Sequence, residues 1–144
     1  MLIRLTDDQI AKYWPDIRFA VSKSLPPTLK GEGDKMNRIL EALLAGTAQC
    51  WASVDRETKQ LDGVVTTSVV EDYLTGAKSL MIYTIYGYRP SIINSWKEGY
   101  ETLVKYAKSK NCGRLIGFTS EKRIVDIVGK FGGNTDFTLC MMEV

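Results

Sequence analysis

Arg89 lies in a short segment whose residues could bind an anion. An apolar, β-rich run over 80–86 is followed by a run with helical spacing over 91–109, so the sequence predicts a strand end leading into a helix start. The first N–H groups of a helix have no partner within it and carry partial positive charge, so such a junction can bind a phosphate. The Arg89 guanidinium would add a bidentate donor. The candidate binding residues are Ile85, Tyr86, Arg89, Ser91, Ile92, Asn94 and Ser95.

The same junction lacks glycines that would let a phosphate approach the backbone. Ile92 is β-branched and would screen the amides, and Pro90 removes one N–H donor. Ser91 has a purely structural alternative, because its hydroxyl can cap the following helix. The segment is therefore either an altered anion site or an ordinary capped helix start.

Three residues on the central strands are candidates for proton transfer. Tyr83 and Tyr86 carry phenols within the 80–86 run, and Glu71, next to Asp72, ends the preceding β-branched run. A phenol can protonate a leaving group, and a carboxylate can accept a proton from an amine. The structural alternative, which the sequence favours, is a pair of half-buried sheet tyrosines and a solvated strand end. No active-site motif surrounds any of the three.

Composition excludes several classes of function. The chain has no histidine, which removes the commonest general base and zinc ligand. Its 19 basic and 17 acidic residues are interspersed, and a net charge of +2 gives no electrostatic case for a nucleic acid or membrane partner. The three cysteines, Cys50, Cys112 and Cys140, lack metal-site spacing, so we expect no metal and three buried thiols of a reducing compartment.

The length of 144 residues indicates one domain spanning 1–144. No apolar run approaches the roughly 20 residues of a membrane span, and the opening residues do not resemble a signal peptide. We therefore expect a cytoplasmic protein.

Local patterns predict an alternation of strands and helices. Thr6 and Gln9 have the form of a capping box, and Pro15 should divide the helix that follows. Asp34 is the candidate N-cap of the next helix, and Gly46 should end it. Further helices are predicted over 91–109 and 120–131, and strands over 2–5, 49–54, 61–70, 80–86, 114–119 and 136–143.

This order predicts an α/β (mixed α+β) protein built on one sheet. The three middle strands form an antiparallel meander, and the run from 80–86 through a helix to 114–119 is a crossover between parallel strands. The expected architecture is a mixed central sheet with helices on both faces.

The order of elements resembles the Gcn5-related N-acetyltransferase (GNAT) fold over nearly the whole chain. The local sequences that resemble it are 2–8, 49–54, 63–67, 80–86, 100–112 and 129–133. In that family acetyl-CoA lies between the two central parallel strands. Its pyrophosphate rests on a loop that reads Arg or Gln, any two residues, Gly, any residue, then Gly or Ala. With Arg89 in the first position, Ile92 and Asn94 stand where the loop has its small residues.

The resemblance also implies a catalytic acid that this sequence replaces. Many family members protonate the departing thiolate with a tyrosine in the final helix, whereas Phe131 stands in the comparable region here. Two hypotheses follow, and the sequence favours the first. It is a diverged, non-catalytic acetyltransferase-like domain that acts as a scaffold or protein-interaction module. Such a domain is similar in style to small phage structural or accessory proteins, and would be virion-associated if phage-encoded.

The first hypothesis requires a protein partner or self-association and no cofactor. The alternative is an active N-acetyltransferase that moves the acetyl group of acetyl-CoA to an amine. A binder of another small anion through Arg89 ranks below both.

Overall fold

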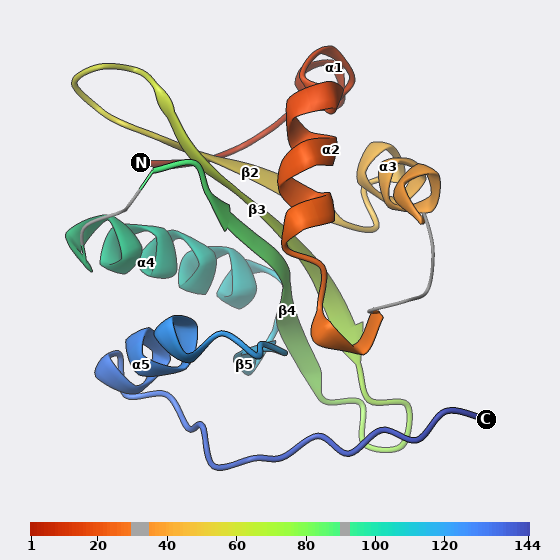
Figure 1. Ribbon diagram of the computed structural model, residues 1–144. Coiled ribbons are helices and arrows are strands. Elements are labelled where there is room, and N and C mark those ends of the chain that lie inside the picture. The colour runs from red at the N-terminus through yellow and green to blue at the C-terminus, as the bar shows by residue number, and fades with distance from the viewer. Residues whose placement is uncertain (30–34, 90–92) are drawn as a thin grey trace.

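The computed structural model describes residues 1–29, 35–89 and 93–144 and contains a five-stranded mixed sheet (Figure 1). The first four strands pair antiparallel in chain order, and the last is parallel to the fourth. The strands are β1 (Leu2–Arg4), β2 (Gln49–Val54), β3 (Leu61–Glu71), β4 (Lys78–Gly87) and β5 (Arg114–Gly117). The predicted meander and parallel crossover are confirmed.

Helices cover both faces of this sheet, as the sequence predicts. One face carries the first three α-helices and the other carries the last two (Figure 1). The helices are α1 (Asp7–Lys12), α2 (Trp14–Lys23), α3 (Met36–Ala45), α4 (Ile93–Ser109) and α5 (Lys122–Lys130), with a 3₁₀ turn η1 (Pro27–Leu29) after α2.

Residues predicted to begin, divide and end the first helices do so in the structure. The Thr6 hydroxyl accepts a hydrogen bond from the Gln9 N–H (3.3 Å), and the Gln9 side chain accepts one from the Thr6 N–H (2.8 Å). Pro15 lies in the first turn of α2, where its missing N–H costs nothing, so the helical run is divided as expected. Gly46 ends α3 with a left-handed φ of 80°. The predicted N-cap Asp34 lies outside the described residues.

Two apolar clusters hold the helices against the sheet. The first lies under α1, α2 and α3, and the second lies under α4. The buried members of the first are Ile10, Ile17, Ala20, Val21, Met36, Leu43, Cys50 and Val64. Those of the second are Trp51, Leu80, Leu103, Ala107 and Cys112.

The C-terminal end of the chain departs from the prediction. Residues 134–144, which we call the C-terminal segment, contain neither helix nor strand, so the strand predicted over 136–143 is wrong. Its alternating pattern is present, but no neighbouring strand pairs with it among the described residues. Cys140 is consequently exposed, which corrects the prediction of three buried thiols, while Cys50 and Cys112 are buried.

No helix in the described ranges 1–29, 35–89 and 93–144 is long and apolar enough to span a membrane.

Candidate functional site

Pairing between the two parallel strands stops halfway along β4. The ladder runs from Ser79–Arg114 to Ile82–Gly117, and β4 then continues to Gly87 paired only with β3. A Cβ on Gly117 would lie 3.2 Å from the Ile82 carbonyl oxygen, so glycine allows close approach at the last pair. Beyond this pair the strands part. One backbone edge of β4 then has no strand partner among the described residues.

A β-bulge lies at the point where the strands part. The β3–β4 register steps from Thr66–Thr84 to Thr67–Ile82, which leaves Tyr83 as the extra residue. A bulge bends its strand and re-aims a side chain, and bulges are frequent beside active sites. Burial raises the pKa of the Tyr83 phenol above its ordinary value of 10.0. The phenol therefore stays protonated near neutral pH and can donate a proton.

Tyr86 lies at the same end of β4 but packs into the cluster under α2. Its ring makes edge contacts with Phe19 (5.9 Å between centroids) and with Tyr88 (5.1 Å). The Tyr88 hydroxyl in turn donates to the Asp16 carbonyl oxygen (3.0 Å). This aromatic group ties the end of β4 to α2, as the sheet-residue interpretation of Tyr86 expects. Ile85, the residue before it, is half-buried.

Arg89 is engaged by its own chain. Its Nε donates to Asp62 Oδ1 (2.9 Å) and its Nη1 to Gln60 Oε1 (3.1 Å), while Nη2 forms an ion pair with Asp62. An anion at this junction would therefore compete with Asp62 for the guanidinium.

The remaining loop candidates can be placed only in part. Ser91 and Ile92 lie outside the described residues, so the predicted cap and the predicted screening of the amides are not located. Asn94 falls in the first turn of α4, and Ser95 follows it, half-buried. Nearby Trp96 has a buried indole N–H with no acceptor among the described residues. Buried donors are rarely left unpaired, so this N–H could serve a ligand acceptor.

Glu71 is far from the point where the strands part. It pairs with Lys78 at the opposite end of β4, roughly 16 Å from Tyr83 at the usual rise per residue. The neighbouring Asp72 carboxylate accepts hydrogen bonds from the Leu74 N–H (2.8 Å) and Thr75 N–H (3.2 Å), which is a turn-forming role. Glu71 and Tyr83 cannot act on the same proton at that separation.

Phe131 has a packing role. Its ring stacks on Tyr100 at 5.4 Å with an interplanar angle of 18°, which joins the end of α5 to α4. The sequence reasoning did not single out Tyr100, nor the end of pairing at Gly117. Gly117, a glycine within a predicted strand, was the available signal for the end of pairing.

Comparison with known proteins identifies the fold. No protein-family model matches the chain, and no curated protein matches it in sequence. Solved structures match it over its full length. A probable acetyltransferase aligns with TM-score 0.71 at 12% identity, over 100% of this chain and 97% of that one. The ribosomal-protein-alanine N-acetyltransferase from Brucella melitensis biovar Abortus 2308 aligns with TM-score 0.66 at 14% identity, over 100% and 99%.

A third match was solved with a CoA-containing molecule. AAC(6')-Iy, in complex with the bisubstrate analogue CoA-S-monomethyl-acetylneamine, aligns with TM-score 0.71 at 12% identity, over 100% of this chain and 97% of that one. Identities at this level define the fold alone. The chain therefore has a GNAT-like fold.

Proposed function

We propose that the protein is an N-acetyltransferase that binds acetyl-CoA where β4 and β5 part and transfers the acetyl group to an amine. The observation that carries this proposal is the end of the β4–β5 ladder at Ile82–Gly117. The sequence could not tell whether the central strands separate, and it favoured the non-catalytic hypothesis without that information. A cytoplasmic location, where acetyl-CoA and reduced thiols occur together, belongs to the same proposal.

The unpaired edge of β4 fits an extended, amide-bearing ligand. Along Tyr83–Gly87 alternate backbone N–H and C=O groups face the side that β5 has left. The pantetheine arm of CoA is an extended chain with amide groups, so it can pair with a strand edge as an added strand does. Such binding uses the backbone, so it tolerates the absence of glycines in the loop after Arg89.

Tyr83 is the residue we place at the chemical step. The amine nitrogen attacks the thioester carbonyl carbon, and the carbon–sulfur bond breaks as the new amide bond forms. The departing sulfur takes the Tyr83 phenol proton, the attacking nitrogen loses its proton to water, and the Tyr83 phenolate then regains a proton from solvent. Loss of a general acid of this kind lowers the rate by about 10²–10⁴.

The test compares two tyrosine-to-phenylalanine variants. Tyr83→Phe removes the proposed acid, while Tyr73→Phe makes the same change at a side chain that is 98% exposed in the β3–β4 turn. Calorimetry with acetyl-CoA gives the affinity. Transfer to a panel of amines, including a peptide amino terminus and an aminoglycoside, is followed by chromatography of released CoA. A thiol reagent is unsuitable, because Cys140 is exposed.

We expect Tyr83→Phe to bind acetyl-CoA as the wild type does but to transfer at least about 100-fold more slowly. Tyr73→Phe should match the wild type in both measurements. Equal transfer by Tyr83→Phe and wild type would refute the role of Tyr83, while absence of acetyl-CoA binding by the wild type would refute the function itself.

The non-catalytic hypothesis remains the second candidate because two contacts favour it. Asp62 neutralises Arg89, and Phe131 stacks where the resemblance expects an acid. Asp62→Asn distinguishes the two functions, because it frees the guanidinium. An acetyl-CoA site that uses Arg89 should then bind more tightly, whereas a scaffold domain should show no acetyl-CoA binding with or without the change. The scaffold hypothesis also includes a protein partner and a phage origin.

A further inference from the structure

The outer edge of β5 and the C-terminal segment are both unpaired. β5 is the last strand of the sheet, and no described residue pairs with the edge that faces away from β4. An open strand edge presents unpaired N–H and C=O groups and favours addition of another strand. The C-terminal segment meanwhile leaves α5 and runs below β5 without joining the sheet (Figure 1).

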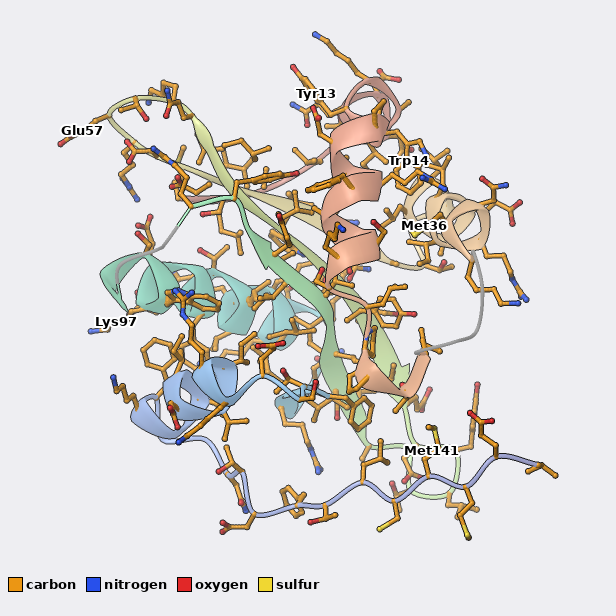
Figure 2. All side chains as sticks on the ribbon, in the orientation of Figure 1. Tyr13, Trp14, Met36, Glu57, Lys97 and Met141 are labelled. Carbon is orange, nitrogen blue, oxygen red and sulfur yellow. The ribbon has the colours of Figure 1, made fainter. Side chains whose placement is uncertain are left out.

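The C-terminal segment has the side-chain pattern of a strand with one apolar face. Phe137, Leu139 and Met141 alternate with Asp136, Thr138 and Cys140. Phe137 is 82% exposed, and Leu139 and Met141 are 56% and 57% exposed. Side chains around Met141 project from both sides of this segment (Figure 2). An apolar face of this kind is normally buried against a partner.

The surface around β5 is itself incompletely covered. No side chain of α5 is fully buried, although Ile124, Val125, Ile127 and Val128 lie at helical spacing on one face. Phe118, directly after β5, is 42% exposed. A strand added at the edge of β5 would place an apolar face against this surface and would complete the ladder.

The chain leaves α5 through a hydrogen-bonded turn that sets the starting direction of the C-terminal segment. Gly132 has a left-handed φ of 80°, and the Gly133 N–H donates to the Val128 carbonyl oxygen (2.9 Å). The Asn134 side chain then accepts from the Asp136 N–H (2.9 Å). These bonds fix the direction in which the segment starts, and in this conformation the segment does not join its own β5.

We propose that the C-terminal segment pairs with β5 of a second copy of this chain, and that the exchange is reciprocal. Each copy carries both an open edge and an unpaired strand, so one two-fold dimer satisfies both copies at once. Both ladders form together, and the apolar face of each segment is covered by the other copy. The dimer does not depend on whether the protein is an enzyme.

The first test measures the oligomeric state of the full chain by sedimentation equilibrium over a range of concentrations. We expect a monomer–dimer equilibrium in the wild type. Leu139→Asp puts a charge on the face to be buried and should raise the dissociation constant by about tenfold or more. Leu74→Asp is the matched control, because Leu74 is 97% exposed in the β3–β4 turn and should leave the equilibrium unchanged.

Circular dichroism confirms that Leu139→Asp folds as a monomer, which is expected because Leu139 lies outside both buried clusters. A wild type that stays monomeric at every concentration would overturn the proposal. A dimer that Leu139→Asp does not weaken would overturn it equally, because its interface would lie elsewhere.

Hydrogen exchange then tests the ladder itself. Amides in 136–143 and in β5 should become protected together, and only at concentrations where the dimer forms. Protection of 136–143 that persists in the monomer would show pairing with the segment's own chain. Protection that is absent in the dimer would exclude a strand ladder, and either result contradicts the exchange.

Discussion

The N-terminal and C-terminal regions of this chain bury their apolar side chains to different degrees. In the N-terminal region, from β1 through α3, each helix places buried side chains against the sheet, and Ala20 and Val21 are completely buried. In the C-terminal region, from β5 onward, α5 has no fully buried side chain, and the segment after it pairs with no described residue. Both regions have clear amphipathic patterns, so the pattern alone does not determine what covers an apolar face.

This difference in burial should have its largest effect on the rates at which the cysteine thiols react. Burial raises the pKa of Cys50 to about 12, so near pH 8 only on the order of one molecule in ten thousand carries its thiolate. Cys140 is exposed. With a thiol reagent near pH 8 we expect Cys140 to react at least about 100-fold faster than Cys50 in the folded monomer. Mass spectrometry of the labelled peptides measures both rates. Equal rates would mean that the N-terminal region opens readily.

A matched pair of isoleucine truncations compares the stability of the two regions. Ile17 is 2% exposed under α2, and Ile17→Ala should lower the free energy of unfolding by about 2–5 kcal/mol. Ile127 in α5 is half-buried, so Ile127→Ala should cost only about 1 kcal/mol. Urea denaturation at low protein concentration measures both. Comparable losses would show that α5 is packed as firmly as α2.

Two glycines provide a second matched pair. A Cβ on Gly63 would lie 2.5 Å from the Tyr86 carbonyl oxygen, within the β3–β4 ladder. Gly63→Ala should therefore cost about 1–3 kcal/mol, because paired backbone must shift. A Cβ on Gly133 would lie 2.4 Å from Val128 Cγ1. The Val128 carbonyl oxygen would also lie close, at 3.0 Å. Because the Val128 side chain is partly exposed and the chain beyond Gly133 carries no ladder, Gly133→Ala should cost less than Gly63→Ala. Thermal unfolding of both variants decides whether the regions differ in this way.

The smallest expected effect is electrostatic and lies where the β2–β3 hairpin meets α4. The hydrogen bond from Arg56 holds the pKa of Glu98 below its ordinary value of 4.5, and the N-terminal ammonium lies 3.8 Å from the same carboxylate. Because the folded pKa is lowered, this contribution is present above the unfolded pKa and is lost as the pH falls through the folded one. Glu98→Gln should therefore reduce stability slightly at neutral pH. Its difference from wild type should vanish in acid and shrink in high salt.

Features that depend on neighbouring residues in the sequence were predictable. The Thr6–Gln9 capping box and the division at Pro15 follow from local backbone chemistry, and both are present. The end of α3 at Gly46 follows in the same way, because glycine reaches a left-handed φ without strain. The order of elements was enough to recognise the fold.

Features that depend on distant partners were not predictable. Residues 136–143 alternate as a strand should, but a strand needs an edge to pair with, and local sequence does not say whether one is available. The bulge at Tyr83 and the end of the ladder at Gly117 arise from the register of three strands. Tyr83 could therefore be proposed from its residue type, while its place beside the parting strands required the structure.

The central claim is that the parted strands β4 and β5 bind acetyl-CoA. Isothermal titration of the wild-type chain with acetyl-CoA, backed by a thermal-shift scan, tests it most directly. We predict saturable binding in the micromolar range, about −8 kcal/mol, with a rise in melting temperature. No heat and no shift at millimolar ligand would contradict the claim and would leave the fold as a scaffold.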